Sequence, residues 1–235
     1  MGRVIFLFFI CSYLASAQSS KQLRDSILKY KTTNPTLAVK FGLEYDLLTS
    51  NRVPDKEKQN TYALLGEILM EMGLYASAIS YLNNSVQIYT TLAKSDKNFP
   101  EIDKPPWVIL NIGNIYLKKR DYKKAAEKYQ QALSLFEKIG DKNAKFYGLN
   151  TANSNLGLIE ERKGNYKKAE EIYYQIYQRR LEKEKKEDIL YSLSQLITVK
   201  LLQGDELAAQ NKLKEAESVY QLADEKQNNS LLTRN

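Results

Sequence analysis

Two stretches of the sequence share a pattern that decides the fold: residues 120–133 read RDYKKAAEKYQQAL, and residues 164–177 read GNYKKAEEIYYQIY. In the first stretch, apolar or small residues recur at steps of three and one, which places them on one face of an α-helix. These residues are Tyr122, Ala125, Ala126, Tyr129, Ala132 and Leu133. The lysines and glutamates between them belong to the solvent-facing side. We therefore interpret the tetrapeptide YKKA, which both stretches contain, as a packing element whose lysines are exposed.

The helix that begins after Asp121 is predicted to be the second half of a helical hairpin. An amphipathic run at residues 107–119 precedes it. Pro105 and Pro106 suit the first turn of that earlier helix, because their missing N–H groups are not needed there. Asp121 is a favourable N-cap for the second helix. The sequence thus predicts a hairpin at residues 105–138.

The same frame recurs along the chain as a small residue in a first helix, a turn, and an alanine on a second helix. The small residue is glycine at Gly66, Gly113 and Gly157. The turns begin at Gly73, Arg120, Gly164 and Gly204, and the alanines are Ala78, Ala125, Ala169 and Ala209. A glycine in mid-helix costs about 1 kcal/mol relative to alanine, so its repetition needs a reason. We expect these glycines to let the alanine-bearing helix approach closely.

This frame resembles the tetratricopeptide repeat, or TPR. The best match is formed by Ile112-Gly113, Tyr116, Asp121-Tyr122, Ala125, Tyr129 and Ala132, and the weakest unit has Ile197 in the glycine position. The resemblance implies an all-α fold, a TPR-like α-solenoid of about five antiparallel helical hairpins that form a right-handed superhelix. Such units stack because none of them can bury its apolar face alone.

The predicted organisation has four parts along the chain. Residues 1–17 are a signal peptide, residues 18–55 a degenerate N-terminal helical hairpin, residues 56–226 the TPR-like repeats, and residues 227–235 a polar C-terminal tail. The individual repeats are expected at about 56–94, 105–138, 149–184 and 186–226.

The first residues carry the pattern of a secretory signal. Arg3 precedes the apolar run VIFLFFI, and the small residues Ala15 and Ala17 mark a cleavage site after Ala17. The alternative, an uncleaved anchor, is disfavoured because the run is short for a bilayer span. The mature protein is therefore predicted to be exported, periplasmic or secreted, without stable membrane insertion. It would also lack cysteine, since Cys11 is the only one.

The composition argues against catalysis and against a nucleic-acid partner. The chain has no His, and the lysines of YKKA fall on polar helix faces, where they stay protonated and make poor bases. No glycine-rich phosphate loop or metal-ligand spacing is present in the sequence. The 35 basic residues exceed the 28 acidic ones, but lysines and glutamates interleave as on solvated helix faces. We expect no catalytic residue, metal or cofactor, and no nucleic acid.

In the TPR family, the first helices of successive hairpins line a concave groove that grips a peptide or a helix. Transferring those positions gives a partner-binding groove of Trp107, Leu110, Asn114, Lys118, Leu158, Arg162, Tyr191 and Thr198. Asn114 matches a position that often binds the ligand backbone, and Trp107 and Tyr191 are candidate aromatic anchors. Two alternatives stay open: Trp107 packs under the proline loop, and Asn114 faces water. Leu110 stands where some TPRs place a lysine that holds a C-terminal carboxylate, which argues against that mode.

Two functions follow from this resemblance. The first is an exported, non-catalytic TPR scaffold that binds a protein or peptide in its concave groove. The alternative is a truncated sensory ectodomain, because the layout also resembles the exported TPR region of Bacteroidetes-type sensory regulators, which are transmembrane signalling proteins. Neither function names the partner or fixes the oligomeric state.

Overall fold

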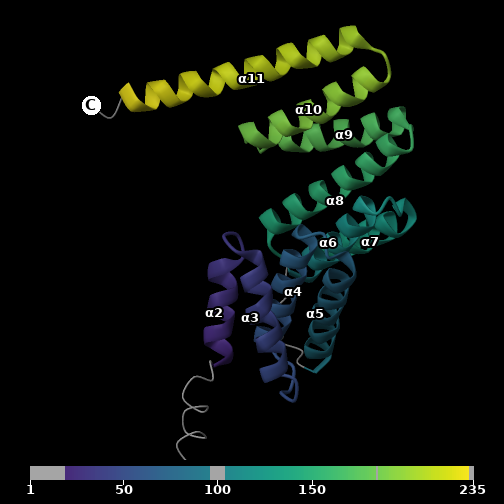
Figure 1. Ribbon diagram of the computed structural model, residues 1–235. Helices are drawn as coiled ribbons and strands as arrows, with labels where there is room; N and C mark the ends of the chain where they lie inside the picture. Colours follow the sequence, from purple (N-terminus) through teal and green to yellow (C-terminus); the bar gives the residue numbers. More distant parts are fainter. Residues whose placement is uncertain (1–18, 96–103, 184, 233–235) are drawn as a thin grey trace, which may run out of the picture. The chain divides into compact units, whose positions relative to one another are not determined.

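The structure is a computed structural model that describes residues 19–95, 104–183 and 185–232. These residues form ten α-helices and no strand (Figure 1). The chain divides into two compact units, residues 1–100 and residues 101–235. The predicted signal peptide and cleavage site, and the segment ahead of Lys104, lie outside the described residues.

The first unit contains two helical hairpins. Helices α2 (Ser20–Tyr30) and α3 (Pro35–Leu48) form the first hairpin, and α4 (Lys56–Glu71) and α5 (Tyr75–Ser95) form the second. The hairpins meet where α3 packs on α4. Their shared core consists of Leu23, Ile27, Ala38, Tyr45, Leu65 and Ile68. The two hairpins of this unit thus span residues 20–48 and 56–95.

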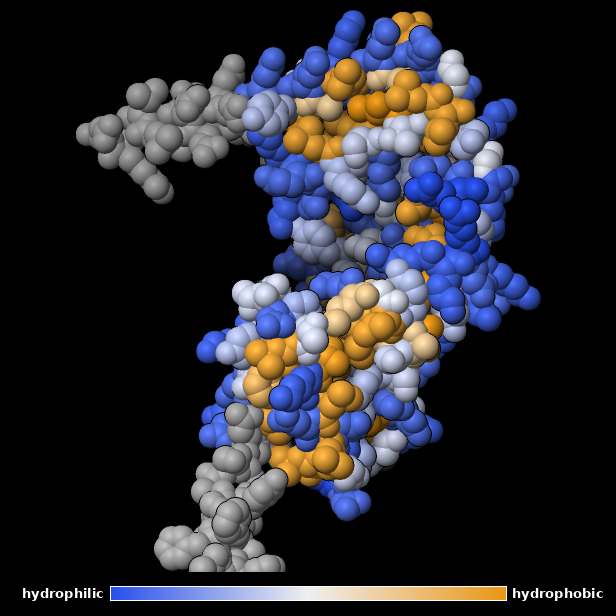
Figure 2. All heavy atoms as spheres, in the orientation of Figure 1, coloured by the Kyte–Doolittle hydropathy of each residue, from blue (hydrophilic) through white to orange (hydrophobic). Residues whose placement is uncertain are grey.

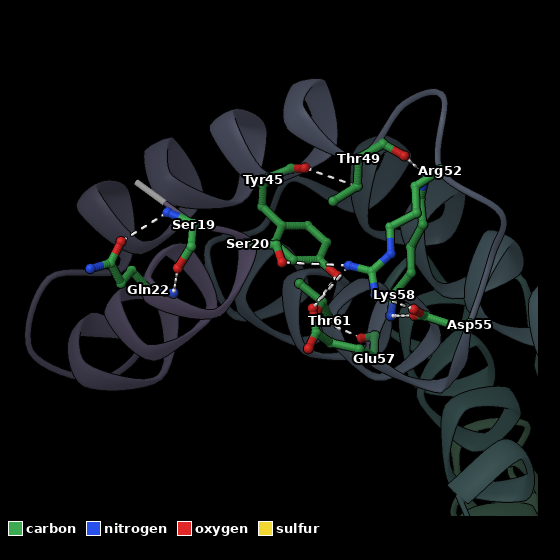
Figure 3. Close-up of polar contacts among 10 residues, drawn as sticks. All are labelled: Ser19, Ser20, Gln22, Tyr45, Thr49, Arg52, Asp55, Glu57, Lys58 and Thr61. Atoms are coloured by element: carbon green, nitrogen blue, oxygen red, sulfur yellow. Dashed lines mark hydrogen bonds and ion pairs between the residues drawn. The ribbon is translucent and has the colours of Figure 1, made fainter. Parts of the chain in front are cut away.

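Polar contacts fix the connection between α3 and α4 (Figure 3). Arg52 donates from Nη2 to Asp55 Oδ2 at 2.6 Å and from Nη1 to Ser20 Oγ at 3.5 Å. Lys58 is buried, and its Nζ donates to the backbone oxygen of Thr49 at 2.7 Å. A buried ammonium needs a partner of this kind, so the contact holds α4 in one register against the end of α3.

The second unit contains three hairpins in series. They are α6 (Lys104–Lys118) with α7 (Tyr122–Phe136), α8 (Lys142–Arg162) with α9 (Tyr166–Leu181), and α10 (Lys186–Leu202) with α11 (Glu206–Leu232). Successive hairpins pack through α7 on α8 and through α9 on α10. Every first helix of the unit is thus followed by an antiparallel second helix, as the sequence frame predicts.

Two boundaries differ from the sequence prediction. Helix α8 begins at Lys142, ahead of residue 149, because the carboxylate of Asp141 caps it and accepts from Ala144 N at 2.7 Å. Helix α11 continues through Leu232, so most of the segment predicted as a polar tail from residue 227 is helical. No glycine or proline interrupts that segment, and polar residues alone do not end a helix.

The turns inside four hairpins have one geometry. The backbone φ is +77° at Gly73, +82° at Gly164 and +77° at Gly204, and it is +60° at Arg120. At each turn two N–H groups return to the end of the preceding helix; for example, Arg120 N donates to Leu117 O and Asp121 N to Tyr116 O, both at 2.9 Å. This Schellman arrangement satisfies carbonyls that the helix end leaves open.

The mid-helix glycines permit close approach, but the group that needs the space is larger than alanine. A Cβ atom on Gly113 would lie 2.6 Å from Cε1 of Tyr129, and one on Gly157 would lie 2.6 Å from Cε1 of Tyr173. The YKKA alanine lies one helical turn before each of these tyrosines, and both alanines, Ala125 and Ala169, are fully buried. The predicted close packing is therefore confirmed. A tyrosine ring occupies the space at Gly113 and Gly157, and at Gly66 the nearest groups are the Leu82 side chain and the backbone oxygen of Ala78, the alanine expected there.

Both units also expose large apolar side chains. Figure 2 shows apolar surface over α2 and α3 and, in the second unit, over α10 and α11. In the first unit these residues include Leu43, Leu47 and Leu48, and in the second Leu201, Leu202 and Leu207. Among the described residues, no helix combines the length and the hydrophobicity that a membrane span requires.

Candidate functional site

Asn114 is held in place where α7 packs on α6. We call the contact between a mid-helix glycine and the tyrosine ring of the partner helix, here Gly113 and Tyr129, a joint. Because Gly113 has no side chain, the ring of Tyr129 lies against α6. The Tyr129 hydroxyl then donates to Asn114 Oδ1 at 2.8 Å, and Asn155 Nδ2 of α8 donates to the same oxygen at 3.0 Å. The Asn114 side chain is half-buried and already bonded within the protein. Its carboxamide nitrogen faces Asn111 Oδ1 at 3.4 Å, a long contact that a ligand carbonyl could replace.

Similar bonds connect the first helices of all three hairpins in the second unit. Asn155 of α8 reaches Asn114 of α6, and Gln195 Nε2 of α10 donates to Ser154 Oγ of α8 at 2.7 Å. The three helices that the TPR resemblance assigns to the groove are thus linked side chain to side chain. These bonds hold the three helices against one another; Ser154 is buried, whereas Asn114 and Asn155 are half-buried.

A basic pocket, which we call the basic notch, lies at the turn end of this surface. It has a volume of about 540 Å³ and is lined by Leu117, Lys118, Arg120, Tyr122, Leu158 and Arg162. The notch therefore brings together Lys118, Leu158 and Arg162, three of the predicted groove residues. None of its three cations forms an ion pair with another described residue.

Arg120 gives the basic notch an unusual feature. Among the described residues it is the only non-glycine residue with a positive φ, and the three other Schellman turns have glycine at its position. A left-handed conformation costs an L-residue roughly 1–2 kcal/mol. Sequence reasoning placed Arg120 in a turn but did not select it as a site residue. The exchange of glycine for arginine within the repeated frame is the signal that could have identified it.

Two predicted groove residues offer less surface than the resemblance implies. The Trp107 ring stacks edge-on against Phe136 with centroids 4.9 Å apart, and it is half-buried. Leu110 is 3% exposed, because it faces the core of the unit instead of the groove surface. Packing against its own unit therefore accounts for Leu110, and we leave it out of the binding surface. Trp107 retains only a partial contact area.

The remaining predicted residues on α10 are accessible. Tyr191 is 54% exposed, and the guanidinium of Arg180 lies over its ring at 5.2 Å from the centroid. Thr198 is exposed, and its hydroxyl donates to Ser194 O at 2.9 Å on its own helix. Tyr191 thus presents an accessible ring that the Arg180 guanidinium contacts.

The surroundings of Tyr129 and Tyr173 raise the pKa of both phenols above the usual value. Burial raises the pKa of Tyr129, and burial together with the charge of Glu161 raises the pKa of Tyr173, whose hydroxyl donates to Glu161 Oε2 at 3.1 Å. These hydroxyls act as hydrogen-bond donors that orient Asn114 and Glu161. The described residues contain no group of three or more His, Cys, Asp or Glu side chains placed to hold a metal ion.

Comparison with protein families identifies the repeated unit. Models of the tetratricopeptide repeat match residues 59–91, 106–139 and 151–182. These segments coincide with the hairpins α4/α5, α6/α7 and α8/α9. None of the curated proteins compared with the chain matches it.

Solved structures with the same arrangement of helices share little sequence with the chain. BtubC from P. vanneervenii has a TM-score of 0.68 and 17% identity, over 87% of this chain and 80% of its own. The nearly identical TPR-like repeats of a Podosopora anserina protein have a TM-score of 0.69 and 14% identity, over 89% and 100%. The apo form of RapI has a TM-score of 0.70 and 13% identity, over 86% and 70%. At these identities the comparison supports the fold alone.

Proposed function

Because the chain is a tetratricopeptide repeat protein, we propose that it is a non-catalytic scaffold that binds a protein or peptide partner along the first helices of its second unit. Repeats of this family generally mediate contacts between proteins. The surface of α6, α8 and α10 has the linked polar groups described above and an exposed aromatic ring at Tyr191. These features suit an extended or helical segment that needs both hydrogen bonds and an apolar anchor.

The observation that carries this proposal is the unpaired charge of the basic notch. Lys118, Arg120 and Arg162 line one pocket, and no described carboxylate pairs with them. Like charges placed together repel, and one of the three residues also carries the cost of a left-handed backbone. Local rules of this kind are broken most often at functional sites. We therefore assign the notch to an acidic side chain of the partner, with Leu158 as its apolar wall.

The rest of the surface orients the partner. Asn114 of α6 and Asn155 of α8 supply carboxamides. Tyr191 and Thr198 lie on α10, the first helix of the last hairpin. Trp107 contributes its accessible edge only. An acidic group in the notch would thus fix the register of a segment whose apolar residue meets Tyr191.

The test compares two labelled peptides that differ only in charge. One has glutamates and aspartates spaced between apolar residues, and its analogue has glutamines and asparagines in their place. Fluorescence polarisation should show at least tenfold tighter binding of the acidic peptide, and the difference should shrink at high salt because salt screens exposed charges. Equal affinity for the two peptides would refute the assignment of the notch.

Paired variants locate the binding surface. The double variant Lys118→Gln with Arg162→Gln should bind the acidic peptide at least tenfold more weakly. The matched control, Lys123→Gln with Lys167→Gln, removes two equally exposed lysines from the second helices and should leave binding unchanged. Tyr191→Ala tests the anchor better than Trp107→Ala, because Trp107 also packs against Phe136. If the control pair weakens binding as much as the notch pair, net charge alone explains the affinity.

Export is a separate part of the proposal. It is supported by the apolar run after Arg3 and by the small residues before Gln18. Mass spectrometry of the protein recovered from its source should find Gln18 at the N-terminus, and a chain that retains Met1 would contradict export by this signal. The sensory-ectodomain alternative is supported by neither the family models nor the structures named above.

A further inference from the structure

A second cavity of the second unit lies on another face of α8. It has a volume of about 310 Å³, near the lower end of the roughly 300–1,000 Å³ typical of small-molecule sites. Helix α7 contributes Leu133 and Glu137, α9 contributes Arg179, and α8 contributes Phe146, Leu149, Asn150 and Asn153. The α8 residues are spaced by three, one and three, which is a single helix face. Leu158 and Arg162 of the basic notch belong to a different face, so the two sites are separate.

Asn150 is the residue that marks this cavity. It is 1% exposed, and neither its Nδ2 nor its Oδ1 has a hydrogen-bond partner among the described residues. Buried polar side chains are nearly always bonded, and on the same helix the Ser154 hydroxyl and the Asn155 carboxamide both are. Leucine has the same number of side-chain heavy atoms and no polar group to satisfy, so packing alone does not call for an asparagine here. An unsatisfied carboxamide in the wall of a cavity points instead to a ligand that enters and bonds it.

The charges around the cavity favour an anion. Glu137 is already neutralised, because Lys145 Nζ lies 2.8 Å from Glu137 Oε2 and donates to Glu137 O at 2.7 Å. Arg179 is exposed and forms no ion pair with a described residue. The cavity therefore keeps one uncompensated guanidinium, whose planar fork matches a carboxylate.

The other walls are apolar or accept hydrogen bonds. Leu133, Phe146 and Leu149 provide aliphatic and aromatic surface. Asn153 donates from Nδ2 to Leu149 O at 2.9 Å, which leaves its Oδ1 as an acceptor. One cavity thus combines a cation, carboxamide acceptors and an apolar wall.

We propose that this cavity binds a small molecule in which a carboxylate, an N–H group and an apolar side chain branch from one carbon. This is the chemistry of an apolar α-amino acid and of the last residue of a peptide. The carboxylate pairs with Arg179, the N–H group donates to Asn150 or Asn153, and the side chain packs against Leu133 and Phe146. The Asn150 carboxamide is closed to solvent in this conformation, so binding includes its rotation toward the cavity.

Three ligands test the chemistry by isothermal titration calorimetry on the whole chain: L-leucine, N-acetyl-L-leucine and L-leucinamide. The first two carry the carboxylate and should bind, whereas leucinamide should bind at least tenfold more weakly. Tighter binding of leucine identifies a free amino acid, and tighter binding of N-acetyl-leucine identifies a peptide end. No binding of any ligand up to about 10 mM, or equal binding of leucinamide, would overturn the proposal.

Variants then place the ligand in this cavity. Arg179→Gln should weaken the better ligand at least tenfold, and Asn150→Leu should weaken it to a similar extent. Lys138→Gln is the control, since it removes an exposed cation beside Glu137 that does not line the cavity. Circular dichroism checks that each variant is folded, and Asn150→Leu should melt at the same or a higher temperature because it removes an unsatisfied amide. If Arg179→Gln binds like the wild type, the site is wrong, and this variant decides the matter even if Asn150→Leu does not fold.

Discussion

The hairpins α6/α7 and α8/α9 share one internal joint and differ at their turns. In both, the ring of a tyrosine on the second helix packs against a glycine on the first helix. A Cβ atom added to either glycine would lie 2.6 Å from the nearest ring atom. The turn, however, holds Arg120 in one hairpin and Gly164 in the other, at φ of +60° and +82°. We propose that the difference separates two roles, in which the repeated glycine–tyrosine contact stabilises each hairpin and the residues that break the repeat determine what the protein binds.

Removing the tyrosine rings should reduce the free energy of unfolding more than any other change to these two hairpins. Tyr129→Ala and Tyr173→Ala each delete a side chain that is at most 1% exposed and leave a cavity beside a glycine, which has nothing to fill it. We expect a loss of about 3–5 kcal/mol in the free energy of unfolding for each variant. Urea unfolding followed by circular dichroism measures it. If the two losses differ by more than about 2 kcal/mol, the joints are not equivalent.

Replacing the glycines by alanine should reduce the stability less than removing the tyrosine rings. Gly113→Ala and Gly157→Ala improve helix propensity by about 1 kcal/mol but place a methyl group against a buried ring. Overpacking of this kind costs about 1–3 kcal/mol, so we expect a net loss of stability for both. A gain of about 1 kcal/mol would mean that propensity decides and that the ring moves freely. Adding Tyr129→Leu to Gly113→Ala should recover part of the loss.

The joint and the turns show how much the sequence could predict. The steps of three and one from Tyr122 locate the helices, because a buried face needs apolar residues at helical spacing. The same pattern does not say which atom meets Gly113, since the side-chain direction of Tyr129 depends on how the helices cross. Leu110 shows the same limit, because a position on a first helix can face the groove or the core. The cavity at Asn150 needed the structure, since its walls come from three helices.

Alkaline pH should weaken both glycine–tyrosine contacts through their hydroxyl groups. The pKa of Tyr129 and that of Tyr173 are raised above the usual value of about 10 in the folded state. The folded chain therefore keeps protons that the unfolded chain loses, and stability present below pH 10 declines as the pH rises above it. Each such tyrosine contributes a slope of up to about 1.4 kcal/mol per pH unit. Tyr129→Phe and Tyr173→Phe should each make the decline shallower in urea unfolding at pH 9 to 11, and an unchanged slope would contradict a shifted pKa.

The same two variants should differ in stability at neutral pH. Tyr129→Phe removes a bond to the neutral Asn114, and Tyr173→Phe removes a bond to the carboxylate of Glu161. A neutral bond contributes about 1 kcal/mol and a charge-assisted one about 1.5–3 kcal/mol. Tyr173→Phe should therefore lose more stability at pH 7, and a larger loss for Tyr129→Phe would indicate that the Asn114 network is the stronger joint.

The smallest expected effect on stability concerns the turns, and it bears most directly on function. Arg120→Gly should stabilise the protein by about 1 kcal/mol, because glycine adopts the left-handed conformation without strain, and Gly164→Ala should destabilise it by a similar amount. Arg120→Gly should at the same time lower the affinity for the acidic peptide several-fold, since it removes one of the three cations of the basic notch. Gly164→Ala should leave that affinity unchanged. Thermal melts and fluorescence polarisation on the same samples measure both quantities. A variant that gains stability and loses affinity would show that arginine is kept in the turn for binding, whereas a gain in stability with unchanged affinity would leave Arg120 as a strained residue without a role in the notch.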